Sequence, residues 1–135
     1  MTHLLDTNAC VVNLRLGMGS SVALRLAAAP LGSVGLCSVV VAVLLFGAMR
    51  SNNPTLVWNQ VATFCGQFSV LPFDLKSAEE YARIRSHLAA RGQLIGPNDL
   101  LIAATALANG LILVTHNTAE FSRVPGLTLE DWQVP

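Results

Sequence analysis

Short apolar runs alternate along this chain with longer segments that mix apolar and polar residues. The short runs are rich in aliphatic residues and predict strands buried on both faces, as in a parallel sheet. The longer segments predict helices, from their apolar spacing and from the Ser, Pro and Gly residues at their ends. We expect strands at 3–5, 34–37, 70–71, 112–115 and 127–129, separated by helices at 8–16, 20–29, 38–50, 54–68, 77–91 and 97–109. This order predicts an α/β fold with α/β/α layers around a short central parallel sheet, as a single domain over residues 1–135.

The ends of the predicted helices carry specific local signals. Ser20, Ser38 and Ser77 are each placed to cap a helix N-terminus, because a serine hydroxyl accepts a hydrogen bond from a first-turn amide. Gly92 and Gly110 are placed to end helices, because glycine adopts the left-handed conformation of a C-terminal cap.

The composition is unusually apolar, with 53% hydrophobic and 12% charged residues. We therefore expect a partner or a second copy to cover part of the apolar surface, including the helix face near Val57 and Val61. The formal net charge is zero, so binding to nucleic acid requires a local basic patch or a bridging cation. Four arginines can form such a patch, although a solvated helix face is the simpler explanation of the first two: Arg83, Arg85, Arg91 and Arg123.

No charged residue occurs between Arg25 and Arg50, a span long enough to cross a bilayer. Pro30, Gly32 and Gly35 interrupt it, so we expect a turn, a strand and a helix rather than a membrane span. The three cysteines are widely spaced and form no CxxC motif. This usage indicates reduced thiols and predicts a cytoplasmic protein.

Three acidic residues stand at the ends of predicted apolar elements. Asp6 follows the first strand, Asp99 opens an apolar helix, and Glu120 follows the strand at 112–115. Ligands bind α/β proteins at the carboxyl ends of parallel strands, so we expect these side chains to lie close together there. Clustered carboxylates are typical ligands of hard cations such as Mg²⁺ or Mn²⁺.

Each of these residues also has an ordinary structural explanation. Asp6 can cap the helix that follows it, and Asp99 can be a first-turn acid favoured by the helix dipole. Glu120 is explained equally well as a solvated loop residue, and Asn117 as a turn cap. His116 lies near the proposed site, although a lone loop histidine is more often simply exposed.

Several segments together resemble the PIN-domain endoribonucleases, specifically the VapC-type toxins of toxin–antitoxin pairs. The matching stretches keep the family's order and cover nearly the whole chain: Leu4–Asn8, Cys37–Gly47, Gly96–Ala104, Leu113–Phe121 and Val124–Trp132. The resemblance implies that Asp6, Asp99 and Glu120 are catalytic, with Asp6 and Asp99 as metal ligands. Five polar residues can act as supporting donors that orient the acids, and each can equally be an ordinary cap or strand end: Thr7, Asn8, Ser38, Thr115 and Asn117.

Val43 is the one serious departure from the family pattern. The second matching segment normally carries a glutamate at this position, in a Ser-x-x-x-x-Glu-Leu-like run that begins here at Ser38. The expected quartet of acids is reduced to three. Because valine and glutamate codons differ by one base and an active toxin harms its host, we interpret Val43 as an inactivating substitution of a catalytic position.

The resemblance implies a Mg²⁺-dependent endoribonuclease, with Mn²⁺ as a plausible substitute, that cleaves RNA such as tRNA. It further implies a homodimer, a cognate antitoxin as partner, and impaired activity in this chain because of Val43. The alternative is a catalytically inactive module of the same fold that retains antitoxin or RNA binding. A phosphatase-like enzyme is a third interpretation, but no Asp-x-Asp pair occurs at Asp6.

Overall fold

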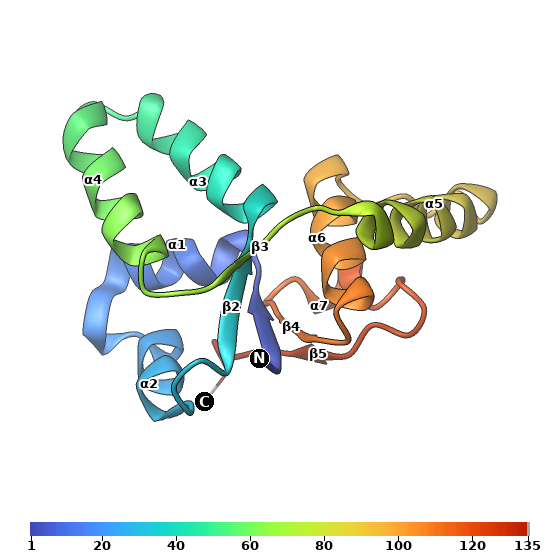
Figure 1. Ribbon diagram of the computed structural model, residues 1–135, viewed down its shortest axis with the longest axis horizontal. Coiled ribbons are helices and arrows are strands. Elements are labelled where there is room, and N and C mark those ends of the chain that lie inside the picture. The colour runs from blue at the N-terminus through green and yellow to red at the C-terminus, as the bar shows by residue number, and fades with distance from the viewer. Residues whose placement is uncertain (135) are drawn as a thin grey trace.

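The sheet has five strands, all parallel, in the order β3-β2-β1-β4-β5 (Figure 1). The computed structural model describes residues 1–134. Central strand β1 pairs Leu4 with Gly35 on one side and with Leu113 on the other. The strands are β1 (His3–Leu5), β2 (Val34–Cys37), β3 (Val70–Leu71), β4 (Ile112–Val114) and β5 (Leu129–Glu130). The predicted α/β fold with a short parallel sheet is confirmed.

Helices cover both faces of the sheet, so the predicted three layers are also confirmed. Helices α1 to α4 lie on one side of the sheet and α5 to α7 on the other (Figure 1). This division follows from right-handed crossovers, because the chain reverses its direction across the sheet after β3. The helices are α1 (Thr7–Leu16), the 3₁₀ turn η1 (Gly17–Gly19), α2 (Ser21–Ala28), α3 (Ser38–Met49), α4 (Pro54–Cys65), α5 (Leu75–Ala90), α6 (Pro97–Ala108) and α7 (Thr118–Phe121).

The chain leaves the neighbouring strands β1 and β4 in opposite directions. From β1 it continues through α1 and α2 to β2, and from β4 it continues through α7 to β5 on the other side. A parallel sheet has a crevice at such a point, outside the carboxyl ends of the strands. Asp6 is the first residue after β1, and its amide donates a 3.0 Å hydrogen bond to the carbonyl oxygen of Val114. The carboxylate of Asp6 is therefore held at this crevice.

The central strands are apolar throughout because helices cover both of their faces. Leu4, Leu5, Leu36 and Leu113 have no exposed surface. Burying a leucine side chain contributes roughly 1.5–3 kcal/mol, so these strands anchor the sheet. The buried face of α6 consists largely of small residues: Ala103, Ala104, Ala106 and Ala108.

Glycines end the two helices where the sequence predicts it. Gly92 after α5 and Gly110 after α6 both have a φ of +64°. Past Gly110, the amide of Leu111 donates to the carbonyl oxygen of Ala106 at 2.9 Å, which closes a Schellman motif. This turn brings the chain from α6 directly into β4.

Only one of the three predicted serine caps is present. The hydroxyl of Ser20 accepts a 3.0 Å hydrogen bond from the amide of Ala23, as expected. In contrast, Asp74 caps α5, because its carboxylate accepts from the amide of Ser77 at 3.0 Å and a carboxylate competes well for this position. Ser38 is the first residue of α3 and not its cap.

Several predicted elements also differ from the structure in their bounds or their type, and α5 for example begins at Leu75 and not at residue 77. Helix α4 ends at Cys65 and not at residue 68, because the chain turns at Gly66. Strand β5 begins at Leu129, where pairing with β4 sets its register through Val114 and Glu130. The segment that contains Glu120 is the short helix α7, where the sequence predicts a loop.

Part of the apolar surplus remains on the surface. The exposed large side chains include neighbouring positions at the end of α3 and the start of α4: Phe46, Met49, Leu56 and Trp58. The expectation that the face near Val61 stays uncovered is wrong, because Val61 is buried in the core beside Phe64. Part of the exposed apolar surface therefore lies toward the tip of the α3–α4 hairpin, while Met18, Leu31 and Leu75 are exposed elsewhere.

Two further expectations concern the environment of the protein. Within residues 1–134, no helix combines the length and apolar character that crossing a bilayer requires. Cys10, Cys37 and Cys65 are buried and form no disulfide. Burial raises the pKa of all three thiols, which keeps them protonated and unreactive in the folded state.

Gly110 and Gly47 make a matched pair of stability tests, because a methyl group added to either Cα would meet no other atom within 4 Å. Gly110 has a φ of +64°, so we expect Gly110→Ala to destabilise the fold by about 1 kcal/mol. Gly47 lies inside α3, so Gly47→Ala should stabilise the fold by up to about 1 kcal/mol. Urea unfolding measures both, and shifts of the same sign would contradict the two backbone assignments.

Candidate active site

Asp6 is positioned by β1 and by the start of α1. Its side chain is 3% exposed, and its Oδ1 accepts a 2.8 Å hydrogen bond from the amide of Ala9. Burial raises the pKa of Asp6 above its ordinary value. Hydrogen bonding from Thr115 and from the Ala9 amide offsets only part of this increase. The predicted capping role of Asp6 is therefore present. The same carboxylate also faces the crevice.

Asp99 approaches from the opposite layer, in the first turn of α6. Pro97 occupies the start of this helix, and Gly96 before it has no side chain to act as a cap. Burial, together with the negative charges of Glu120 and Asp6, raises the pKa of Asp99 to about 6. Three acids therefore repel one another across this region.

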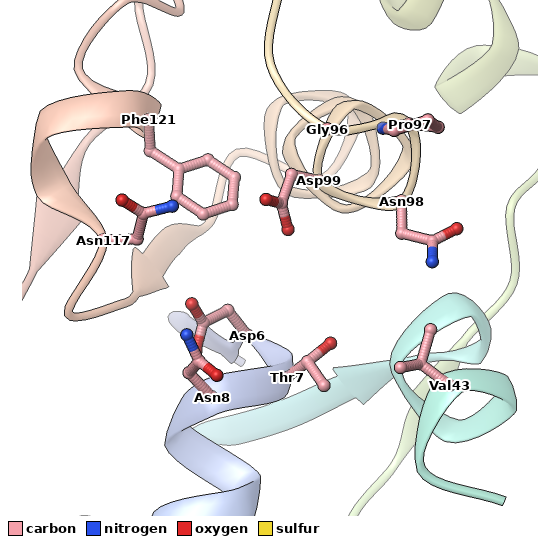
Figure 2. Close-up of a pocket in the computed structure, with 10 residues that line it drawn as sticks. All are labelled: Asp6, Thr7, Asn8, Val43, Gly96, Pro97, Asn98, Asp99, Asn117 and Phe121. Atoms are coloured by element: carbon pink, nitrogen blue, oxygen red, sulfur yellow. The ribbon is translucent and has the colours of Figure 1, made fainter. Parts of the chain in front are cut away.

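A cavity of about 340 Å³ lies between these elements. Figure 2 shows Asp6, Asp99 and Asn117 around the same open space, with Val43 of α3 beyond Thr7. The lining combines polar and apolar residues, and it contains two carboxylates and no lysine or arginine. The lining residues are Asp6, Thr7, Asn8, Val43, Gly96, Pro97, Asn98, Asp99, Asn117 and Phe121.

Three of the predicted site residues do not line this cavity. Thr115 is buried behind it, where its hydroxyl accepts from the amide of Asn117 at 3.0 Å. Ser38 is exposed at the start of α3. The carboxylate of Glu120 accepts from the Gly96 amide at 2.9 Å and from the Asn117 side chain at 2.6 Å.

Sequence reasoning missed three lining side chains, those of Pro97, Asn98 and Phe121. Asn98 lies beside Asp99 at the start of α6, and Phe121 closes the side next to Asn117 (Figure 2). The signal for Asn98 was present, because a polar residue between Pro97 and an acid begins an otherwise apolar helix. Phe121 is fully buried, and nothing in its spacing separates it from an ordinary core residue.

His116 lies on the surface near the site and outside the cavity. Its Nδ1 lies 2.9 Å from Oδ2 of Asp131, and most of its side chain is exposed. It is absent from the cavity lining. The structure therefore gives His116 a surface hydrogen-bond contact with Asp131 and places it outside the cavity.

The cavity offers oxygen donors of the kind that a hard divalent cation prefers. Carboxylate oxygens come from Asp6 and Asp99, amide oxygens from Asn98 and Asn117, and a hydroxyl from Thr7. Mg²⁺ is commonly held by one or two carboxylates and keeps several waters, so this set fits it. Over the described residues 1–134, no three His, Cys, Asp or Glu side chains converge as a metal-binding group. Val43 occupies the cavity wall where a third acid is expected.

The sequence pattern of the PIN domain matches residues 3–127. Since this is most of the chain, the chain belongs to the PIN-domain family. Among curated relatives, it is 37% identical over 132 residues to the tRNA(fMet)-specific endonuclease VapC of Shigella flexneri, covering 98% of each chain. Its homology is thus to the VapC branch of that family.

Solved structures give the same result. The chain in the crystal structure of DNA-bound VapBC from Salmonella typhimurium superposes with a TM-score of 0.92 at 32% identity, covering 98% of both chains. A second, more distant match is VapBC-5 from Mycobacterium tuberculosis, described as a member of the VapBC family of toxin–antitoxin systems. It has a TM-score of 0.67 at 25% identity and 96% coverage of both chains.

Burial of Asp99, together with repulsion from Glu120 and Asp6, predicts that neutralising Asp99 stabilises the protein when divalent cations are absent. The folded-state pKa of about 6 is above the ordinary 3.8, so the charged form destabilises the fold as pH rises from about 4 to 6. We expect Asp99→Asn to add about 1 kcal/mol at pH 7 in EDTA, discounted because the group is only half buried. The gain should disappear below about pH 4.

Thermal unfolding in EDTA at several pH values measures this gain. Glu79→Gln on the exposed side of α5 is the control, since Glu79 makes only a 4.0 Å contact with Arg83. If Asp99→Asn lowers the melting temperature at pH 7, the carboxylate is stabilised by a contact other than those described.

Proposed function

We propose that this chain is a VapC-type toxin whose site is that of a Mg²⁺-dependent endoribonuclease, impaired by Val43. The observation that carries the proposal is the pair of carboxylates, Asp6 and Asp99, that two different layers bring to one polar cavity. The cavity lies at the carboxyl ends of β1 and β4, from which the chain continues in opposite directions. Ligands of parallel α/β sheets usually bind at this position. We also propose that residues 1–135 form one domain.

Asp6 and Asp99 would hold the cation, with Asn117, Asn98 and Thr7 as neighbouring oxygen donors. A bound divalent cation supplies Lewis acidity toward a phosphate and lowers the pKa of a coordinated water. The protein's own part is to fix these carboxylates. Asp6 is fixed by its hydrogen bond from Ala9, and Asp99 by its place in the first turn of α6.

The substrate class follows from the relatives. The Shigella flexneri protein is named for cleavage of tRNA(fMet), so we propose RNA, and tRNA in particular, as the substrate here. No basic side chain lines the cavity, so a cation is needed to attract the phosphate backbone to it. Thr7 and Asn8 can donate hydrogen bonds to phosphate oxygens at its rim.

Val43 is the reason to expect weak catalysis. It lies on α3 at the cavity wall and is half-buried, with only aliphatic carbon to offer. Relative to a glutamate, the site lacks one negative charge and two oxygen acceptors. The second candidate function, an inactive module that retains antitoxin or RNA binding, rests on this same residue.

We also propose a cognate antitoxin and a second copy of the chain as partners. Several solved relatives are VapBC assemblies. The exposed Phe46, Met49, Leu56 and Trp58 at the tip of the α3–α4 hairpin provide apolar surface for association. Two-fold symmetry is the commonest closed arrangement for such a surface.

Restoring the acid should restore catalysis. We expect Val43→Glu to raise the cleavage rate of tRNA(fMet) in Mg²⁺ by on the order of a hundredfold over the chain as it stands, because a third carboxylate strengthens cation binding. Val43→Gln is the matched control, with the same length and no charge, and should stay close to the parent. Cleavage is followed on a gel, with EDTA as the blank.

The two candidate functions give different results in this assay. Equal activity in the parent and Val43→Glu would show that Val43 does not impair the enzyme. An inactive Val43→Glu that still binds Mn²⁺ would instead support the binding-module hypothesis. In the Val43→Glu background, Asp99→Asn should abolish cleavage.

Association through apolar surface should resist salt, whereas RNA binding should not. We expect light scattering at micromolar concentration to give a dimer at both 0.1 and 1 M NaCl, conditions across which charge interactions are screened within about 10 and 3 Å. RNA binding should weaken steeply over the same range. A monomer at both salt concentrations would contradict the proposed dimer, and Trp58→Ser should shift the dimer toward monomer.

A further inference from the structure

Glu120 connects two segments that both line the cavity: the start of α6 and the turn after β4. Its Oε1 accepts a 2.9 Å hydrogen bond from the amide of Gly96, and its Oε2 accepts a 2.6 Å hydrogen bond from Nδ2 of Asn117. Both carboxylate oxygens are therefore engaged. Glu120 itself is absent from the cavity lining, whereas Gly96 and Asn117 are both part of it.

The two connected segments carry the chemistry of the site. Gly96 is the residue before α6, three positions ahead of Asp99, and a methyl group at its Cα would lie 3.5 Å from Oδ2 of Asp99. Asn117 follows β4, and its own amide donates to the Thr115 hydroxyl. A shift of either segment would therefore change the distance between Asp99 and the carboxyl end of β4.

A second contact joins the segment after α7 to the segment before α6. Arg123, just after α7, donates from Nη1 to the carbonyl oxygen of Leu94 at 3.5 Å. The two hydrogen bonds to Glu120 lower its pKa, and the charge of Arg123 lowers it further, so the carboxylate stays ionised as an acceptor. The segment before α6 has no side-chain cap of its own at Gly96. The buried side chain of Ile95 and these contacts with Glu120 and Arg123 hold the segment in place.

We propose that Glu120 is a positioning residue that holds the start of α6 against the β4 turn, and that it does not coordinate the cation. This inference rests on the proposed metal-dependent function. It replaces the catalytic role that the family resemblance assigns to Glu120. Residues that orient metal ligands in this way commonly change metal affinity 10- to 100-fold when they are removed.

Three substitutions separate position from charge. Glu120→Gln removes the charge but keeps the length, and with the Asn117 amide turned over it can keep both hydrogen bonds. Glu120→Ala removes charge and contacts together. Glu120→Asp keeps the charge, but its side chain is one carbon shorter and cannot span both partners.

The first measurement needs no metal and no activity. Amide hydrogen exchange of Gly96 in EDTA should accelerate at least tenfold in Glu120→Ala and in Glu120→Asp, and should change little in Glu120→Gln. The Leu113 amide in β4, which donates to Thr128 at 2.9 Å, controls for general loss of structure. Unchanged Gly96 exchange in Glu120→Ala would overturn the proposal.

The second measurement is Mn²⁺ calorimetry in the Val43→Glu background. The neutral pair is decisive: Glu120→Ala should bind Mn²⁺ at least tenfold more weakly than Glu120→Gln. If these two bind equally weakly while Glu120→Asp binds like its parent, Glu120 acts through its charge and the proposal is wrong. If Val43→Glu binds no Mn²⁺ at all, the proposed function fails, and the Gly96 exchange rates still decide whether Glu120 holds this loop.

Discussion

The reversal of chain direction between β1 and β4 is the constraint on which the rest of this structure depends. Because the two strands are neighbours and the chain leaves them toward opposite faces, the sheet has an open crevice at their carboxyl ends. The hydrogen bond from Asp6 to Val114 is made across this pair. Helix α6 reaches the same crevice from the other layer and supplies Asp99. Without this reversal, the two acids would stand on separate parts of the molecule.

The site is assembled against its own electrostatics. Asp6 is almost fully buried, Asp99 is half-buried, and Glu120 lies close enough to raise the pKa of Asp99. Such an arrangement lowers the stability of the protein when no cation is bound. A cation that binds only the native state relieves this repulsion and shifts the equilibrium toward the folded protein. Val43 in the cavity wall carries no charge and adds nothing to this repulsion.

Much of the fold was predictable because strong local signals agree with one another. Buried apolar strands such as Leu4–Leu5 and glycine stops such as Gly110 each have a single simple interpretation. The predictions failed where two residues compete for one task. Asp74 takes the cap predicted for Ser77, and only the three-dimensional path of the chain decides between them.

The site was predictable in its acids and less so in their roles. Asp6 and Asp99 could be proposed from their places at the ends of apolar elements, and the structure brings them to one cavity. The partners of Glu120 could not be foreseen, because Gly96 is 24 residues away in sequence and offers only a backbone amide. Backbone donors have no residue signature, so contacts of this kind emerge only from the folded arrangement of the chain.

The pairing of β1 with β4 has a consequence for how the protein is made. His3 of β1 is aligned with Ile112 of β4. Strand β1 therefore cannot pair on this side until β4 has been made. Contacts of such high sequence separation form slowly, since loop closure precedes any gain from them. A growing chain on the ribosome can form α1 to α4 with β2 and β3 early. At that stage α6 and β4, which form one side of the crevice, have not been made. The two acids thus come together only after α6 and β4 have been made, and a chain that stops before them carries no assembled site.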